Sequence, residues 1–258
     1  MFPIPKNVFQ VWIGDPANIP KNYAQSHDSI QTFLVSRGWT YRLLFQEEVE
    51  DFIKTQFAWF WPTYNSYEHN IQKADAIRPL WLKVYGGVYL DMHFELLAPL
   101  DPLFETSDND AYFLPSPNFP SVYTNAFIAA KPGALVLDLY IAEMVQYATT
   151  PSEWHIGKHL TVMNSTGPLA LTRALSKSER VFGHLPLNVL APCSVCDLDN
   201  CPINAGPSPQ LMRQMTGKTW HGIDSTLIDF MVCKWKYLVG FLCVAIFIGV
   251  FLYFYLIA

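Results

Sequence analysis

The sequence predicts an α/β fold with a central sheet, followed by one transmembrane helix. Three observations predict this architecture. Apolar runs typical of buried strands alternate with stretches of helical spacing between residues 8 and 147. Asp91 directly follows one of these strands, and ligand chemistry in α/β sheets gathers at the carboxyl ends of strands. The segment 237–257 contains no charged residue.

Each element of the predicted domain follows from a local pattern. Gly14-Asp15-Pro16 breaks the first apolar run, and Gly86-Gly87 supplies the C-terminal stop of the helix before the third strand. Strands are expected at 8–14, 39–45, 88–91, 111–114 and 126–130, and helices at 26–36, 47–59, 71–85 and 134–147.

Length and charge limit the classes of function. The chain has 258 residues, of which 51% are hydrophobic, and a formal net charge of −5. This is enough sequence for one well-buried domain, which we expect at residues 1–230. No cluster of lysine and arginine is present, and phosphate backbones are bound through basic stripes. The composition therefore argues against a nucleic-acid partner.

The C-terminal segment 237–257 predicts a single membrane anchor. About 20 uncharged residues in a helix span the apolar core of a bilayer. Trp235 and Tyr237 lie at one edge of the segment and Tyr253 and Tyr255 at the other, as expected for interfacial aromatic belts. The membrane is thus an expected partner of this chain.

The flanking residues favour a cytoplasmic domain. Residues 1–6 lack the basic and apolar regions of a signal peptide, so the anchor is the expected targeting element. Lys234 and Lys236 flank the anchor on the domain side, and the positive-inside rule places such residues in the cytoplasm. The three cysteines at 193–201 do not decide the compartment, because a lone CxxC favours a disulfide or reduced thiols over structural zinc.

The stretch Asp91-Met92-His93 indicates a metal site. On an extended backbone Asp91, His93 and Glu95 point to the same side, because side chains alternate along a strand. A carboxylate and an imidazole that converge at a strand end can hold a divalent cation. Such a cation neutralises a diphosphate leaving group. An isolated D-x-H is more often an incidental strand-end turn, so the context decides.

The preceding helix supplies that context. Asp75 and Arg78 lie three residues apart and share a helix face, which alone would be typical of a surface ion pair. Pro79 removes the hydrogen bond to the carbonyl of Asp75, so a break in the helix is expected at this pair. The break would open polar groups toward a site.

Four stretches in order resemble a known family. They are IPKNVFQVWIG, KADAIRPLWLKVYGGVYLDMHFELLAPLDPL, NAFIAAKPG and TVMNSTGPLALTRAL. Over roughly residues 3–225 the chain resembles glycosyltransferases with a DXD sugar-binding region, which include initiating α-mannosyltransferases and the catalytic subunits of inositol phosphorylceramide mannosyltransferases.

The resemblance implies a fold and a reaction. It implies a GT-A-type nucleotide-sugar-binding fold with a mostly parallel central sheet, and retaining transfer of a hexose assisted by Mn²⁺, with Mg²⁺ possible. Mannose from GDP-mannose is favoured as the donor group, with UDP-sugars open, and the acceptor is a lipid or glycan. Family members in eukaryotes act in the Golgi lumen, which conflicts with the cytoplasmic placement that the lysines narrowly favour.

The resemblance also assigns roles to residues. Asp75, Arg78 and Asp91 are the expected catalytic residues, with Asp75 and Arg78 on the donor and Asp91 as the first metal-binding aspartate. His221 resembles a late histidine that adds a metal contact, although a lone histidine is as often a surface residue. The expected donor- and acceptor-binding residues, besides Asp75 and Arg78, are Val11, Trp12, Asn125, Ser165, Thr166, Gly167 and Pro168.

The chain departs from the family pattern at His93. Family members carry an aspartate there, and replacing it with imidazole removes a charge and a hard oxygen ligand. Such a site favours Mn²⁺ over Mg²⁺. Two hypotheses follow: an active, membrane-anchored enzyme, or a degenerate relative that binds a nucleotide sugar or a partner enzyme without turnover.

Overall fold

The computed structural model describes residues 4–105, 109–116, 119–149, 157–178, 182–186, 189, 196, 210–215, 222–234, 237, 239, 240 and 248. The chain divides into two compact units, Met1–Trp220 and His221–Ala258. In the second unit, residues 223–234 are helical. The predicted bounds of the catalytic domain and the anchor stay predictions.

The first unit is built on a six-stranded sheet with the order β2-β1-β3-β6-β5-β7. Within these strands only β6 runs antiparallel to its neighbours, so the sheet is mostly parallel. A second, two-stranded sheet pairs β4 with β8. The strands are β1 Asn7–Trp12, β2 Thr40–Phe45, β3 Gly87–Leu90, β4 Phe94–Leu96, β5 Ala111–Pro115, β6 Tyr123–Ala130, β7 Gly183–His184 and β8 Met212–Gln214.

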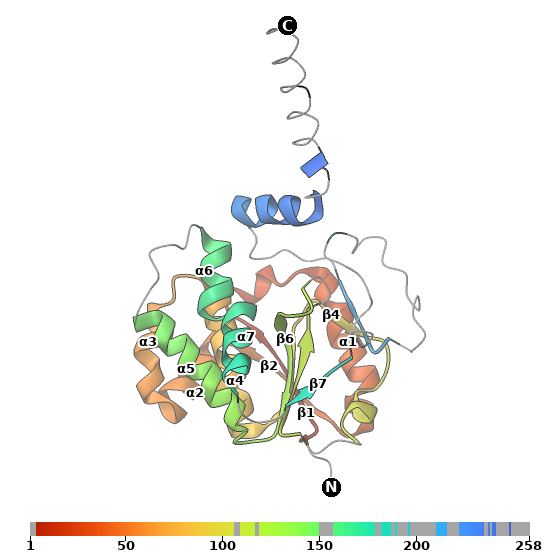
Figure 1. Cartoon of the computed structure of the whole chain (residues 1–258). Helices are drawn as coiled ribbons and strands as arrows, with labels where there is room; N and C mark the ends of the chain where they lie inside the picture. The colour runs from red at the N-terminus through yellow and green to blue at the C-terminus, as the bar shows by residue number, and fades with distance from the viewer. Residues whose placement is uncertain are drawn as a thin grey trace, which may run out of the picture. The chain divides into compact units, whose positions relative to one another are not determined.

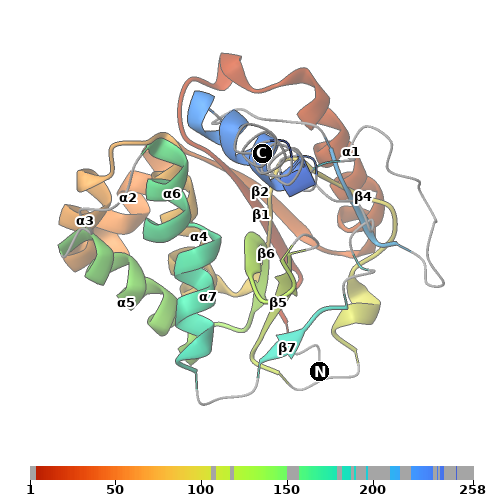
Figure 2. The same ribbon diagram turned by 45° about the horizontal axis from the view of Figure 1, so that its top comes forward.

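Helices cover both faces of the large sheet (Figures 1 and 2). One face packs against α2–α5 and α7 and the other against α1 and the small sheet, which gives two buried apolar clusters. The helices are α1 Ala24–Phe33, α2 Gln46–Gln56, α3 Trp61–Ser66, α4 Asn70–Tyr85, α5 Leu135–Thr149, α6 Lys158–Ser165 and α7 Pro168–Ser176. Short 3₁₀ turns lie at Pro16–Asn18, Lys21–Tyr23, Val35–Arg37, Ala58–Phe60 and Asp101–Leu103.

The helix before β3 ends where the glycines predict. Gly86 follows α4 with a φ of +62° and Gly87 has a φ of +102°, which L side chains rarely adopt. A Cβ on Gly87 would lie 2.3 Å from the carbonyl oxygen of Asn7, so β3 could not approach β1 this closely with any other residue. The glycine pair therefore fixes where β3 begins.

The prediction of a break at Pro79 is wrong. Helix α4 continues through Pro79 to Tyr85, and Leu80 and Leu82 beyond it are fully buried. Burial of the apolar face outweighs the lost hydrogen bond. The helix thus carries Asp75 and Arg78 on one continuous rod.

The predicted anchor falls almost entirely outside the described residues. Among the residues that the structure does describe, no helix is both long and apolar enough to cross a membrane. Of segment 237–257, only residues 237, 239, 240 and 248 are described. The anchor stays a prediction from the sequence.

Candidate functional site

Helix α4 brings Asp75 and Arg78 into the protein interior. Their side chains are only 4% and 3% exposed, and Arg78 Nη2 lies 2.7 Å from Asp75 Oδ1. The surface ion pair that a three-residue spacing normally makes is therefore excluded. An ion pair buried this deeply is retained only where further partners satisfy both groups.

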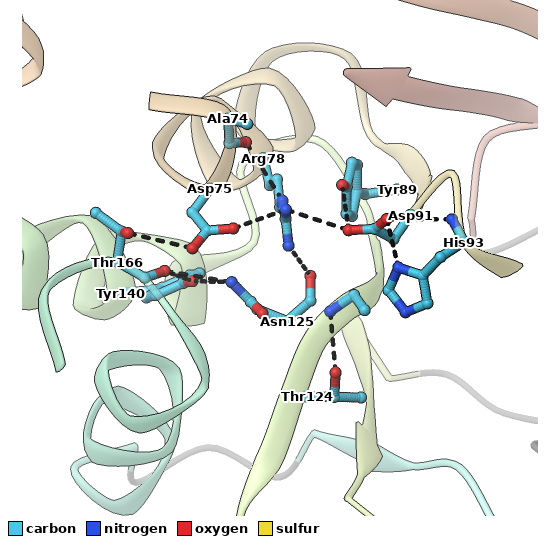
Figure 3. Close-up of polar contacts among 11 residues, drawn as sticks. Ala74, Asp75, Arg78, Tyr89, Asp91, His93, Thr124, Asn125, Tyr140 and Thr166 are labelled. Carbon is cyan, nitrogen blue, oxygen red and sulfur yellow. Dashed lines mark hydrogen bonds and ion pairs between the residues drawn. The ribbon is translucent and has the colours of Figure 1, made fainter. Parts of the chain in front are cut away.

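Arg78 provides those partners from three directions (Figure 3). Its Nη2 lies 3.4 Å from Asp91 Oδ2, so one guanidinium joins the two carboxylates. Its Nη1 donates to the carbonyl oxygen of Asn125 at 2.9 Å, and its Nε donates to that of Ala74 at 3.3 Å. The ring of Tyr89 lies under the guanidinium, with 4.3 Å between Cζ and the ring centroid.

A bulge in β6 makes the carbonyl of Asn125 available. Phe113 pairs with Ile128, but the next residue of β5, Leu114, pairs with Thr124. The residues of β6 between Thr124 and Ile128 therefore have no partner on β5, and such bulges are common next to functional sites. The carbonyl of Asn125 then accepts from Arg78, and that of Ala126 accepts from the Asp91 backbone N–H at 2.9 Å.

The structure corrects the expected extended backbone at Asp91. Residues 92 and 93 form a turn, closed by a hydrogen bond from the Phe94 N–H to the Asp91 carbonyl at 3.0 Å. The chain bends here because β4 leaves the large sheet to pair with β8. Glu95 accordingly pairs with Arg213 instead of facing Asp91.

The turn still brings Asp91 and His93 together. His93 Nδ1 lies 2.6 Å from Asp91 Oδ1, and the His93 backbone N–H donates to the same oxygen at 3.3 Å. Both side chains are 20% exposed. From the other side, the N–H of Met215, the residue after β8, donates to the His93 carbonyl at 2.7 Å and holds the turn in place.

The segment Ser165-Thr166-Gly167-Pro168 also reaches the site. Ser165 ends α6 and accepts a hydrogen bond from Gln72 at 2.8 Å, while Gly167 and Pro168 begin α7. The Thr166 hydroxyl donates to Asp75 Oδ2 at 3.2 Å. The Thr166 carbonyl accepts from the amide of Asn125 at 3.3 Å and from the hydroxyl of Tyr140.

The remaining predicted residues lie apart from this network or outside the described chain. Val11 is buried at the end of β1, next to Trp12, whose Nε1 donates to the Asp15 carbonyl at 2.9 Å. In the sheet β1 is the neighbour of β3, so both strands end at the same edge as Asp91. His221 falls outside the described residues, and its metal contact stays a prediction.

The two carboxyl groups that share the Arg78 guanidinium have pKa values shifted in opposite directions. Burial raises the pKa of Asp75 to about 7, an effect that Arg78 opposes and the charge of Asp91 reinforces. Burial also acts to raise the pKa of Asp91, but the contacts with His93 and Arg78 outweigh it and hold that pKa below its usual value. At neutral pH Asp91 is therefore the more fully ionised of the two carboxyl groups.

The donor set fits a divalent cation that the substrate completes. Asp91 Oδ1 and His93 Nδ1, which lie 2.6 Å apart, are the two donors that would hold such an ion. Within the described part of the chain, no three His, Cys, Asp or Glu side chains gather at one metal position. Diphosphate oxygens commonly supply the remaining ligands. When bound, the ion would neutralise diphosphate charge.

Sequence reasoning missed the aromatic side of the site. Tyr89 donates to Asp91 Oδ2 at 3.2 Å, and alternation along β3 could have found it, because it lies two residues before Asp91. Tyr140 and Gln72 gave no signal. Each is a buried helical residue whose partner, Thr166 or Ser165, is distant in sequence.

The comparisons with known proteins decide the family. Residues 18–109 match the family model described as a glycosyltransferase sugar-binding region containing a DXD motif. The chain is 30% identical over 250 residues to inositol phosphoceramide mannosyltransferase 1 of Schizosaccharomyces pombe, covering 96% of this chain and 72% of that protein. The chain belongs to this family of DXD glycosyltransferases. It is therefore an enzyme of the glycosyltransferase class.

Further comparisons agree with this family. Mannosyl phosphorylinositol ceramide synthase CSH1 of Saccharomyces cerevisiae is 30% identical over 169 residues, covering 66% of this chain and 42% of that protein. Among solved structures, the PaToxG glycosyltransferase superimposes with a TM-score of 0.50 at 19% identity, over 67% of this chain and 68% of that one. The predicted GT-A-like fold with a mostly parallel sheet is thus confirmed.

Proposed function

We propose that this glycosyltransferase transfers a hexose, with retention and with the help of Mn²⁺, from a nucleotide sugar to a lipid or glycan acceptor. The observation that carries the proposal is the buried guanidinium of Arg78 between Asp75 and Asp91. Asp75 and Arg78 bind the sugar and its phosphate, and Asp91 with His93 holds the metal beside the diphosphate. Mg²⁺ can serve where Mn²⁺ is absent.

Mannose from GDP-mannose is the favoured donor group, with UDP-sugars as the alternative. The support is the similarity to mannosyltransferases that act on inositol phosphoceramide, over nearly the whole chain. Asn125 and the segment 165–168 line the donor or acceptor position in this proposal. Val11 and Trp12 border the nucleotide, since β1 ends at the same edge as β3.

Segment 237–257 anchors the enzyme to a membrane in this proposal, which suits a lipid-borne acceptor. The compartment of the catalytic domain is open to test. The two lysines favour the cytoplasm, whereas Cys196 and Cys233 are each disulfide-bonded, and disulfides persist mainly in oxidising compartments. Protease protection in sealed vesicles discriminates the two: digestion without detergent indicates the cytoplasmic face.

The decisive experiment measures nucleotide release and sugar transfer. The full chain in detergent is mixed with GDP-mannose, UDP-glucose or UDP-galactose, in Mn²⁺, Mg²⁺ or chelator, with and without a phosphoinositol-containing lipid. We expect Mn²⁺-dependent nucleotide release, fastest with GDP-mannose, and transfer to the lipid. Deleting residues from Lys234 onward should leave a soluble domain that still hydrolyses the donor.

A binding module without turnover is the second candidate. Both oxygens of Asp91 already take part in hydrogen bonds, one with His93 and the other with Arg78 and Tyr89, so a metal would compete with these partners for the carboxylate. On this reading the wild type binds nucleotide sugar but releases no nucleotide in any metal. Turnover that appears only in His93→Asp would establish it.

A further inference from the structure

The helix at residues 223–234 exposes a row of large apolar side chains, which we call the apolar stripe. Successive members are four, three and one residues apart, and this spacing places them on one face of an α-helix. Contiguous exposed apolar side chains mark an interaction surface. The stripe consists of Ile223, Leu227, Phe230 and Met231, which are 92%, 58%, 52% and 45% exposed.

A second face of this helix is already tied to another part of the chain. Asp229 and Cys233 lie four residues apart and share a face away from the apolar stripe. Cys233 is disulfide-bonded, so the covalent link is made from that face. The link leaves the apolar stripe accessible.

A helix of this length gains most of its stability from whatever covers its apolar face. Isolated helices shorter than about 12–15 residues are marginal in water, and packing of the apolar face normally stabilises them in proteins. In helix 223–234 the apolar face is the exposed one. A partner that covers the apolar stripe would therefore stabilise this helix.

The chain that follows the helix indicates which partner this is. The helix ends at Lys234, and the uncharged segment 237–257 begins at Tyr237. An extended residue spans at most about 3.6 Å, so the end of the helix lies within roughly 11 Å of the start of the expected anchor. Amphipathic helices at a bilayer lie in the headgroup plane, with their apolar face buried about 5–10 Å deep.

The charges on the helix favour apolar burial over attraction to anionic lipid. Asp224 and Asp229 against Lys234 give one positive and two negative charges, a formal sum of −1. Lys234 Nζ lies 5.6 Å from the ring centroid of the exposed Tyr237, and both residue types commonly occupy the headgroup level. Binding should therefore not require an anionic surface.

We propose that helix 223–234 lies in the headgroup plane of the membrane with its apolar stripe inserted among the lipids. The placement rests on the anchor in the proposed function and extends it, since the helix adds a second membrane contact. The first unit ends at Trp220 and the helix begins at Ile223, so the helix tethers the catalytic domain at the surface. A lipid-borne acceptor then meets the enzyme without leaving the bilayer.

Photocrosslinking in the full chain tests this placement. p-Benzoylphenylalanine replaces Phe230 on the apolar stripe, Asp229 away from it or Ile248 within the anchor, one position in each protein. The proteins are reconstituted in phosphatidylcholine vesicles, with or without phosphatidylserine, and lipid adducts are measured by mass spectrometry. We expect adducts at Phe230 and Ile248 and about tenfold fewer at Asp229, with no increase when phosphatidylserine is present.

A paired substitution tests the consequence for the reaction. In the same vesicles, Leu227→Asn combined with Phe230→Asn should lower transfer from GDP-mannose to a phosphoinositol-containing lipid by about tenfold, because half of the stripe loses its apolar contact. Donor hydrolysis, which needs no lipid, should stay within about twofold of wild type and reports that the domain is folded. Asp229→Asn is the control away from the stripe and should leave both rates unchanged.

Four results would overturn the placement. Equal lipid adducts at Phe230 and Asp229 would mean that lipid surrounds the helix, as in a spanning segment. Adducts between Phe230 and protein, within one chain or between two copies, would make the apolar stripe a protein contact. Adducts at Ile248 without any at Phe230 would leave the anchor and the enzyme standing but put the helix outside the membrane. Adducts at neither position would end the anchor and the placement together.

The reaction and the placement can fail separately. A folded wild type that releases no nucleotide from any nucleotide sugar ends the proposed transfer reaction. The lipid adducts at Phe230 do not depend on turnover, so in that case they still support or overturn the placement of the helix.

Discussion

The two halves of the site are built differently. The helix side consists of Asp75 and Arg78 on α4, both at most 4% exposed, with Thr166 and Asn125 around them. The strand side is the turn at Asp91 and His93, which is one fifth exposed and is joined to the chain beyond β8 by the backbone hydrogen bond from Met215. One half belongs to the core, and the other lies at its edge.

This difference explains where the sequence can vary. A change at Asp75 or Arg78 would leave a buried charge unpaired, so the core itself constrains these residues. A change at His93 affects a turn that is one fifth exposed and whose backbone is fixed by other residues. A histidine in place of the family's second aspartate is therefore compatible with this fold.

Arg78→Met should have the largest effect, because it leaves Asp75 and Asp91 without their shared cation. We expect a loss of about 3–5 kcal/mol in unfolding free energy, measured by urea titration, and no detectable donor hydrolysis. Lys83→Met on the same helix is the control. Its ion pair with Asp138 is partly exposed, with side chains at 28% and 46%, so the loss should stay under about 1 kcal/mol.

Arg78→Lys separates the charge from the shape of this group. Lysine keeps the charge but lacks the planar fork that reaches two carboxylates and a carbonyl at once. Turnover should fall by about 100-fold while the protein stays folded. If Arg78→Lys hydrolyses the donor at the wild-type rate, the planar guanidinium is not needed for turnover. Arg78 would then contribute to stability alone.

The sequence predicted which residues form the helix side, but not how deeply they are buried. The order of elements is confirmed, since each expected strand and helix is present within a few residues. Periodicity placed Asp75 and Arg78 on one face, but their burial depends on α6, α7 and the bulge in β6. Those contacts join residues up to 91 positions apart, and no local pattern encodes them.

For the strand side, the predicted contact between Asp91 and His93 is present, but the predicted extended backbone is wrong. Alternation along an extended strand predicted that Asp91 and His93 converge, and they do. The structure achieves this with a turn, because Phe94 and Leu96 join the apolar cluster around α1 and pair with β8. β8 lies more than a hundred residues downstream, so the sequence around Asp91 does not reveal the bend.

Metal dependence tests the strand side next. Asp91→Asn should abolish Mn²⁺-dependent donor binding, because it removes the carboxylate that the ion needs. His93→Asp adds a hard oxygen ligand, so hydrolysis in Mg²⁺ should gain relative to Mn²⁺ by about tenfold or more. Hydrolysis rates in each metal measure both effects. Equal metal ratios in wild type and His93→Asp would exclude His93 from the metal site.

Stability against pH distinguishes the two carboxylates. The folded pKa of Asp75 is raised to about 7, so its protonated form is favoured in the native state. Its contribution to stability is complete below the unfolded value near 3.9 and is lost as the pH rises through 7. Asp75→Asn should therefore flatten the fall in stability between about pH 4 and 7.

Asp91 should act in the opposite direction, because its folded pKa is lowered. Its contribution is present above about pH 4 and is lost as the pH falls through the folded value. Asp91→Asn should thus change the stability profile only in the acid range. Urea unfolding at pH 3–8 measures both variants, and identical profiles would contradict the electrostatic separation of the two halves.

The smallest effect is expected at Glu95, beyond the turn. Its pair with Arg213 links β4 to β8, but the side chains are 22% and 31% exposed, and pairs of this kind contribute about 0–1 kcal/mol. The backbone bond between Met215 and His93 holds the turn independently of this pair. Glu95→Gln should therefore lower the unfolding free energy by less than about 1 kcal/mol and change the Mn²⁺ requirement less than twofold. A Mn²⁺ titration of donor hydrolysis measures this, with wild type as reference. A rise of about tenfold in the Mn²⁺ requirement of Glu95→Gln would contradict this expectation. The geometry of the turn would then depend on the side-chain pair of Glu95 and Arg213.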